Sequence, residues 1–156
     1  MGNYLVQNTP SGVPTLVHVA GKQTRIHSAY DPQKEAKKSI EGFSPERASV
    51  IIVCGLGLGY HVAELQRAHP SCRIIVLEKD DEVVHLAHSV HPDAIQGVSV
   101  ITKAVEIPDV LEHIDMASFR GAIAFRHRPS YLLFKEFYDA LEKDVHQYFS
   151  SRLSDM

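Results

Sequence analysis

An apolar run, Val50–Cys54, leads directly into three glycines at alternate positions, Gly55, Gly57 and Gly59. Five consecutive apolar residues without alternation are typical of a strand that helices cover on both faces. Glycine tolerates positive φ and carries no Cβ, so the main chain can turn sharply here and approach another group closely. A helix-like pattern follows, and its first N–H groups would face the same place. The junction therefore predicts a strand–turn–helix unit of a parallel sheet, with a ligand-binding edge at the turn.

The rest of the chain alternates between short apolar runs and helix-like patterns. The other apolar runs are Arg73–Leu77, Val98–Thr102 and Ala122–Phe125. The helical patterns are Tyr60–Ala68, Asp81–Val90, Ile107–Ile114 and a long closing one, Ser130–Arg152. Strands that alternate with helices are typical of parallel sheets built from strand–helix–strand units. We therefore predict an α/β fold of the Rossmann-like type, in which helices flank a parallel sheet in three layers.

Residues 1–30 lack the alternation of strands and helices that is predicted for the rest of the chain. Short β-like runs separated by turn residues indicate a small N-terminal β lead-in. Asp31 then has the side chain of a helix N-cap, Pro32 suits the first helical position, and Tyr30 is expected to pack this helix start against the sheet. We divide the chain at residue 30 and assign residues 31–156 to the Rossmann-like domain. The two parts are expected to form one compact unit, which is either a fragment of a longer protein or a stand-alone relative of one.

Composition restricts the class of partner. The chain has 16 lysines and arginines against 19 acidic residues, a formal net charge of -3, and no basic tract. Phosphate backbones are bound largely through clustered positive charge, so we expect no nucleic-acid partner. No segment approaches about 18 apolar residues, residues 1–14 lack a signal-peptide pattern, and the two cysteines form neither a disulfide framework nor a metal-binding pair. We predict a cytoplasmic protein that does not associate with membranes.

An acidic residue ends the strand that follows the glycine turn. Glu78 lies roughly 20 residues after Gly59, where a carboxylate can accept hydrogen bonds from ribose hydroxyls. Strand, glycine turn, helix, strand and acid together are moderately specific for a ligand that contains a nucleoside. The predicted cofactor-binding residues are Gly55, Leu56, Gly57, Gly59, Tyr60 and Glu78. The alternative is that the glycines serve only the turn and close packing of the helix on the strand.

The glycine pattern narrows the choice of ligand. Tyr60 stands where the dinucleotide fingerprint has a third small residue, which disfavours NAD, and the segment lacks the lysine of a P-loop. The glycine turn followed by Glu78 is similar to the first two motifs of class I methyltransferases, which bind S-adenosylmethionine. Val53 and Cys54 stand where that family usually has an acidic residue, and the strands that complete its sheet are missing after Phe125. We therefore expect no methyl transfer by this chain.

A second stretch resembles another known family. The segment from His27 to Phe43, HSAYDPQKEAKKSIEGF, precedes the glycine turn and the segment IIVLEKDDEVVHLA. This combination resembles the amino-terminal part of the motility-associated factor (Maf) proteins, which are bacterial flagellin glycosyltransferases. The residues that mark the resemblance are Ser28, Tyr30, Asp31, Pro32, Glu35 and Ala36. It implies a Rossmann-like module beside a separate catalytic domain, with flagellin or that missing domain as a partner.

Three functions stay open at this point. The first is a module that binds a nucleoside or nucleotide sugar in a flagellin-glycosylation protein, and that is not catalytic alone, so no catalytic residue is assigned. The second is a minimal S-adenosylmethionine-dependent methyltransferase. The third is a degenerate, non-enzymatic scaffold that docks flagellin or a neighbouring domain. The sequence does not identify the cofactor, for which a nucleotide sugar or a compound like S-adenosylmethionine is expected.

Other polar residues form weaker patterns. Arg126 and Arg128 follow the last predicted strand and are candidates for an anion contact, with a solvated loop as the alternative. His85 and His88 would adjoin on a helix, but His91 is rotated away from His85. We therefore expect ordinary histidines on a solvated helix face and no metal site.

The remaining helical segments have ordinary features. Asp80 precedes the predicted helix Asp81–Val90 and is expected to cap it. The closing helix carries more apolar positions than one narrow stripe needs. The excess predicts contact with another domain or with a second copy of the chain in a homo-oligomer.

Overall fold

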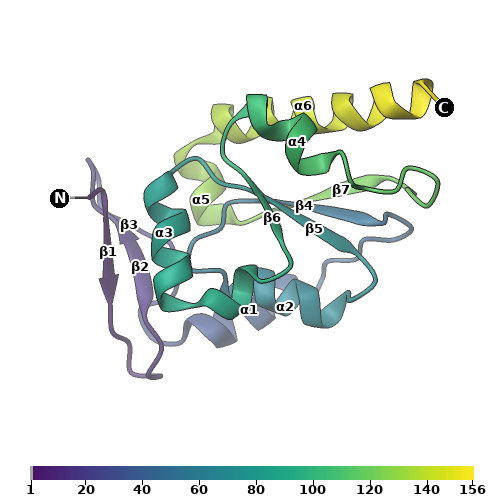
Figure 1. Ribbon diagram of the computed structural model, residues 1–156. Helices are drawn as coiled ribbons and strands as arrows, with labels where there is room; N and C mark the ends of the chain where they lie inside the picture. Colours follow the sequence, from purple (N-terminus) through teal and green to yellow (C-terminus); the bar gives the residue numbers. More distant parts are fainter. Residues whose placement is uncertain (1) are drawn as a thin grey trace.

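The fold contains a small antiparallel sheet and a larger parallel sheet (Figure 1). The computed structural model describes residues 2–156. The antiparallel sheet has the order β1-β2-β3 and consists of β1 (Tyr4–Gln7), β2 (Thr15–His18) and β3 (Thr24–Arg25). The parallel sheet has the order β6-β5-β4-β7 and consists of β4 (Val50–Cys54), β5 (Arg73–Leu77), β6 (Ser99–Ile101) and β7 (Ala122–Arg126). The predicted Rossmann-like α/β class is confirmed.

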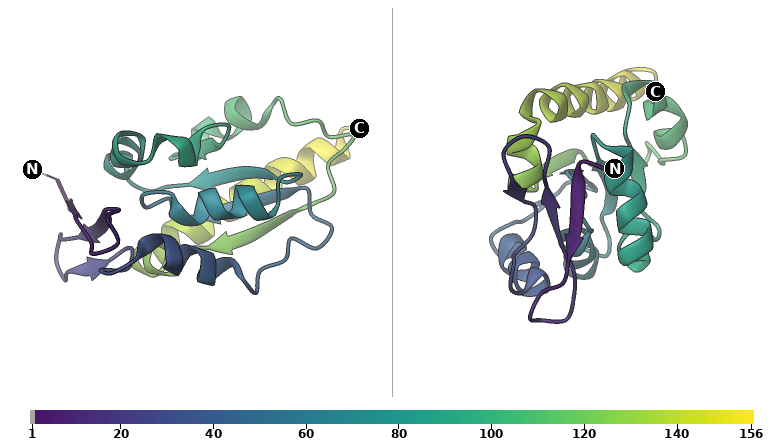
Figure 2. Two further views of the ribbon diagram at one scale, coloured as in Figure 1. Left: turned by 90° about the horizontal axis from the view of Figure 1, so that it is seen from below. Right: turned by 90° about the vertical axis from the view of Figure 1, so that its left-hand side faces the viewer.

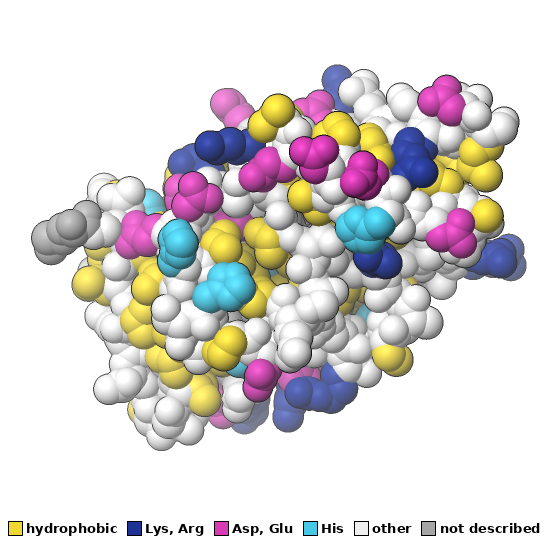
Figure 3. All heavy atoms as spheres, viewed as in Figure 1, with side chains coloured by type: hydrophobic (Ala, Val, Ile, Leu, Met, Phe, Trp, Pro, Cys, Tyr) yellow, Lys and Arg dark blue, Asp and Glu magenta, His cyan; other side chains and the backbone are white. Residues whose placement is uncertain are grey.

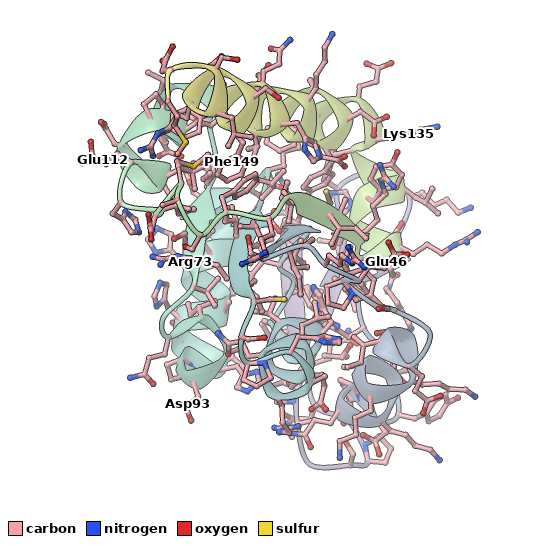
Figure 4. All side chains as sticks on the ribbon, turned by 90° about the vertical axis from the view of Figure 1, so that its right-hand side faces the viewer. Glu46, Arg73, Asp93, Glu112, Lys135 and Phe149 are labelled. Atoms are coloured by element: carbon pink, nitrogen blue, oxygen red, sulfur yellow. The ribbon has the colours of Figure 1, made fainter. Side chains whose placement is uncertain are left out.

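Helices cover both faces of the parallel sheet (Figure 2). One face carries α1 (Pro32–Ile40), α2 (Tyr60–Ala68) and α3 (Asp81–Val90). The other face carries α4 (Ile107–Leu111) and α6 (Lys135–Ser154). Short helices lie in the connections, namely η1 (Pro92–Ile95), η2 (Ala104–Glu106) and α5 (Arg128–Leu133). The end-on view of Figure 4 shows α6 on one side of the sheet and α1 and α2 on the other.

The central strand β4 contributes to two hydrophobic cores. Ile51 and Val53 pack on the side of α1, α2 and α3. Val50, Ile52 and Cys54 pack on the side of α4 and α6. Both faces of the strand are removed from water, which is why the run is apolar at every position rather than at every second one.

The closing helical region is two helices rather than the single predicted helix Ser130–Arg152. α5 and α6 are separated at Phe134, whose dihedral angles are not helical (φ -138°, ψ 48°). The Phe134 ring contacts the ring of His18, and Lys79 Nζ lies 4.2 Å from its centroid. These contacts with the N-terminal sheet and with the loop after β5 account for the break. Beyond it, Phe149 points from α6 toward the sheet (Figure 4).

Two other predicted elements are shorter in the structure. The predicted helix Ile107–Ile114 ends at Leu111, and Ile114 N donates to Leu111 O in a tighter turn. The predicted strand Val98–Thr102 is reduced to β6, which lies at the edge of the sheet and pairs only with β5. A strand paired on one side has fewer hydrogen bonds to extend it.

α1 begins with a closed set of bonds between side chains and main chain. Asp31 Oδ1 accepts from Lys34 N at 3.0 Å, so the predicted N-cap is confirmed. Ser28 Oγ accepts from the N–H groups of Tyr30 and Asp31, and Glu35 Oε1 accepts from Ser28 N. The packing predicted for Tyr30 is wrong: its side chain is 74% exposed. The polar bonds of Ser28 and Glu35 hold this turn instead, with Tyr30 facing outward.

Acidic side chains at the start of α3 fix β1 to the parallel unit. Glu82 accepts from the N–H groups of Asn3 and Tyr4 at 2.9 and 3.3 Å. Asp80 stands at the N-cap position, but its side chain does not cap α3, and that prediction is wrong. The Asp80 carboxylate accepts from Tyr4 OH instead. Leu16 of β2 joins the core on the α1, α2 and α3 face, so the lead-in and the Rossmann-like unit share one core.

The surface is mixed in charge. On the face seen in Figure 3, lysine and arginine side chains appear as separate groups among acidic ones. Leu5 and Val6 of β1 are among the exposed hydrophobic residues. Within residues 2–156, no helix combines the length and the apolar character that crossing a membrane requires.

The order of the strands reverses between β4 and β7. The chain adds β5 and β6 on one side of β4 and then crosses to place β7 on the other side. In open α/β sheets, the crevice outside the carboxyl ends of the strands at such a switch point is the usual ligand site. Gly55 follows β4 and His127 follows β7, so both residues lie at this crevice.

The turn after β4 is packed against side chains from two other segments. Gly55, Gly57 and Gly59 have φ values of 101°, 53° and 86°, a region that favours glycine. A Cβ on Gly55 would lie 2.3 Å from Ser130 Cβ, and a Cβ on Gly57 would lie 2.5 Å from His27 Nε2. The space that is free because these glycines lack side chains is therefore filled by Ser130 and His27 of the protein itself.

Gly55→Ala and Gly121→Ala form a matched pair that tests this packing. The two glycines have φ values of 101° and 102°, but nothing lies within 4 Å of a Cβ on Gly121. Both variants place a side chain at the same positive φ, and only Gly55→Ala adds overlap with Ser130. We expect Gly55→Ala to lower the free energy of unfolding by about 2 kcal/mol more than Gly121→Ala, measured by urea denaturation. Equal losses would contradict the close contact with Ser130.

Candidate functional site

A cavity of about 370 Å³ lies at the switch point. Its walls come from the loop after β3, from α1, from the start of α2 and from the residues at the end of β7. The lining includes Ser39, His27, His61, His127, Arg126 and Arg128. The position is the one expected for a ligand in a doubly wound sheet, and the volume falls in the usual range for small-molecule sites, roughly 300–1,000 Å³.

Three imidazoles form a buried part of the cavity wall. The side chains are His27, His61 and His127, and each is at most 8% exposed. The rings of His61 and His127 stack with their centroids 4.0 Å apart and their planes within 7°. The His27 centroid lies 5.2 Å from that of His127 and 6.1 Å from that of His61. Residues that are distant in the sequence therefore present a compact group of ring nitrogens.

The main chain decides which ring nitrogen carries the proton in two of these histidines. His27 Nε2 accepts from Leu58 N at 2.8 Å, so the proton of the neutral ring lies on Nδ1. His61 Nε2 lies 2.8 Å from Gly55 O, which can only accept, so this nitrogen is the donor and Nδ1 keeps its lone pair. His61 Nδ1 is buried and has no hydrogen-bond partner in the described chain. A buried acceptor without a donor is costly, so a donor or a cation that reached this nitrogen would bind favourably.

Burial keeps all three imidazoles neutral near pH 7. It lowers the pKa of His61 to about 4, although the bond to Gly55 acts in the opposite direction. It also lowers the pKa of His27 and of His127 well below the usual range, and neighbouring imidazoles add to this effect. His127 Nδ1 shares a hydrogen bond of 2.8 Å with Ser130 Oγ. The histidine wall therefore offers neutral donors and acceptors, and any charge in the cavity comes from other residues.

The two predicted anion contacts both line the cavity but differ in their surroundings. Arg126 Nη2 lies 3.1 Å from Glu142 Oε1, and its guanidinium lies over the ring of Tyr131. Its charge is therefore partly compensated and directed toward α6. Arg128 is exposed, and within residues 2–156 no carboxylate lies within 4.0 Å of its guanidinium nitrogens. Arg128 is the cation that is available to an anion at the cavity.

The residues predicted to bind a cofactor at the glycine turn are brought together, but by contacts within the protein. Glu78 is 2% exposed, and its two carboxylate oxygens accept from Leu56 N and Asp80 N, each at 2.9 Å. Tyr60 OH donates to Pro14 O at 2.6 Å. The space beside Glu78 is only about 10 Å³, room for roughly one water molecule. A ribose hydroxyl could reach this carboxylate only by displacing the side chains packed on the turn, because Glu78 is buried and the space beside it is so small.

The histidine wall was not found from the sequence. His27 lies just after β3, His61 just after the glycine turn and His127 just after β7. For His27 and His127, a position just beyond a strand was the available signal, but the three histidines lie too far apart in the sequence for their proximity to be seen. The cluster considered from sequence is different: His85 and His88 are exposed on α3.

Glu78 gives the fold a pH dependence of its own. Burial raises the pKa of Glu78 to about 7, against the hydrogen bonds from Asp80 and Leu56, which lower it. In an unfolded chain a glutamate titrates near pH 4.3. Because the folded pKa is above the unfolded value, the folded state holds this proton more tightly. The contribution of Glu78 to the free energy of unfolding therefore falls as the pH rises from about 5 to about 8.

Glu78→Gln should remove this dependence. We expect the free energy of unfolding of the unmodified chain, minus that of the variant, to fall by on the order of 2–3 kcal/mol between about pH 5 and pH 8. Urea denaturation at a series of pH values measures it. Glu112→Gln, which removes an exposed carboxylate after α4, is the matched control. A difference for Glu78→Gln that is flat, or that rises with pH, would contradict the assignment.

Comparison with known proteins places the chain in a family. Residues 6–91 match the model of the glycosyltransferase Maf N-terminal domain, a segment that includes the glycine turn, His27 and His61. The chain is also similar to the ribosomal RNA small subunit methyltransferase H of Streptomyces avermitilis, with 29% identity over 79 residues. That similarity covers 50% of this chain, which spans only about a quarter (25%) of the length of the methyltransferase. The family match covers more than half of the chain, and the chain therefore belongs to the glycosyltransferase Maf N-terminal domain family.

Proposed function

We propose that this chain is the module of a Maf-type glycosyltransferase that binds an anionic sugar nucleotide in the switch-point cavity. It holds and positions this ligand and does not transfer the sugar by itself, because the matched family is an N-terminal domain and the family resemblance implies a separate catalytic domain. The family resemblance supplies flagellin as the acceptor protein within this proposal. The observation that carries the proposal is the cavity itself, which combines the switch-point position with an uncompensated guanidinium, that of Arg128.

The charges at the cavity favour an anionic group over a cationic one. Arg128 lies at the start of α5 and has no carboxylate partner within the described residues. A guanidinium presents several donors to one phosphate or carboxylate group. Glu35 is the acidic residue of the lining, and its carboxylate is already bonded to Ser28 N at 2.8 Å. Ser39 adds a hydroxyl from α1 to the same lining.

The histidine wall suits the uncharged part of such a ligand. Neutral His27 carries its proton on Nδ1, and His61 presents an unpaired acceptor at Nδ1. Sugar and ribose hydroxyls both donate and accept hydrogen bonds, so they can satisfy either kind of group. The stacked rings of His61 and His127, together with Phe125, also provide flat apolar surface.

Methyl transfer is the second candidate, and one observation favours it. The chain shares 29% identity over 79 residues with a ribosomal RNA methyltransferase. The interior position of Glu78, whose carboxylate is bonded to main-chain N–H groups, counts against S-adenosylmethionine on the glycine turn. The sugar-nucleotide proposal is therefore preferred, and S-adenosylmethionine belongs in the experiment that tests it.

Arg128→Gln tests the proposal by ligand binding. CMP, CMP-linked nine-carbon acidic sugars, UDP-linked sugars and S-adenosylmethionine are compared by thermal shift and titration calorimetry. We expect a sugar nucleotide to stabilise the unmodified chain and the variant to bind it about tenfold more weakly, or about 1.4 kcal/mol, as for loss of one charge-assisted contact. Arg47→Gln is the control, because Arg47 is also exposed but precedes β4, at the opposite end of the sheet.

The other outcomes decide between the alternatives. Stabilisation by S-adenosylmethionine alone would favour the methyltransferase. Stabilisation by flagellin or by the adjoining domain, with no response to any nucleotide, would favour a docking scaffold. Sugar-nucleotide binding that Arg128→Gln leaves unchanged would exclude the cavity as the site.

A further inference from the structure

Ring nitrogens of the three buried histidines lie close together, and the sugar-nucleotide proposal does not require this proximity. One ring nitrogen from each of His27, His61 and His127 lies within 4.8 Å of those of the other two. The three residues come from separate segments, and their rings are neutral. Imidazole nitrogens are favoured ligands of Zn²⁺ and of the neighbouring transition metals.

Two of the histidines already have the partners that metal-bound histidines have. A ligating imidazole usually donates its other N–H to a carbonyl, a carboxylate or water, which fixes the nitrogen that faces the metal. His61 donates from Nε2 to Gly55 O, and His127 Nδ1 is bonded to Ser130 Oγ. The remaining nitrogen of His61, Nδ1, is buried and has no partner in the described chain. This nitrogen therefore has a lone pair that no hydrogen-bond donor uses.

We propose that His27, His61 and His127 bind a divalent cation of the Zn²⁺ class, with the fourth coordination position open to the switch-point cavity. Three protein ligands and one open position are the arrangement that leaves room for water or for an oxygen of a ligand. The adjoining space of about 370 Å³ provides that room. This inference does not rest on sugar-nucleotide binding, since Arg128, which carries that proposal, is not a ligand. With the ion bound, the lone pair of His61 Nδ1 is used by the ion, and an oxygen of a sugar nucleotide would meet the open coordination position instead of this nitrogen.

Binding requires a defined rearrangement. With Zn–N distances near 2.1 Å, tetrahedral geometry places ligand nitrogens about 3.4 Å apart, so the three must contract from separations of up to 4.8 Å. The rings of His61 and His127 must tilt out of their parallel stack. The single lone pair of neutral His27 lies on Nε2 and accepts from Leu58 N, so binding the ion through either nitrogen of this ring breaks that hydrogen bond. The Leu58 amide therefore reports on the site.

The experiment uses the full chain without a polyhistidine tag, stripped with a chelator. We expect equilibrium dialysis and calorimetry to show one Zn²⁺ bound per chain, and Co²⁺ to give the visible absorption of a tetrahedral site. His61→Gln and His127→Gln should each weaken Zn²⁺ binding at least about tenfold. The control is His85→Gln combined with His88→Gln, two exposed histidines on α3, and it should leave binding unchanged.

Two results would overturn the site. One is a failure of the unmodified chain to bind Zn²⁺ more tightly than a variant that lacks both His61 and His127. The second result is measured on the unmodified chain alone, so it still tests the site if circular dichroism shows that these variants do not fold. Zn²⁺ should shift the Leu58 amide resonance and the ring nitrogen resonances of the three histidines in NMR spectra, and unchanged resonances at saturating Zn²⁺ would exclude coordination there.

Discussion

The close packing on the turn after β4 is the contact on which the rest of the structure depends. The positive φ values and missing side chains of Gly55 and Gly57 let Ser130 and His27 reach the main chain. Through this contact, the loop after β3 and the start of α5 are joined to the sheet at its switch point. A side chain at either glycine would separate these segments and disrupt the wall of the cavity.

The same contact determines the chemistry of the cavity. Leu58 N–H can only donate, so it assigns a lone pair to His27 Nε2. Gly55 C=O can only accept, so it assigns the proton of His61 to Nε2. A glycine turn at a helix N-terminus commonly uses its N–H groups to bind a phosphate. Here a neutral imidazole and the carboxylate of Glu78 accept from those groups, and the turn orients side chains of the protein.

Local sequence patterns predicted much of the fold, because individual strands, turns and helix ends are determined by residues that are neighbours in the sequence. The strand, glycine turn and helix from Val50 onward, and the N-cap of Asp31, each depend on residues a few positions apart. Features decided by distant contacts were not predictable in this way. Phe134 leaves the helix for His18 and Lys79. The histidine wall joins the segments after β3 and β7 with the start of α2, which only the folded chain brings together.

Glu78 shows why a glycine-rich turn followed by an acid identifies a fold more securely than a ligand. In this fold an acid at the end of the second strand lies beside the N–H groups of the turn, whatever occupies the crevice. Its carboxylate faces a ligand only if that crevice is left open. In this chain the N-terminal lead-in places His27 against Gly57, and α5 places Ser130 against Gly55. The turn is covered by the protein's own side chains, and the open space is displaced toward α1 and the end of β7, where Arg128 lies. The side chains that cover the glycines, rather than the glycines themselves, therefore determine where a ligand can bind.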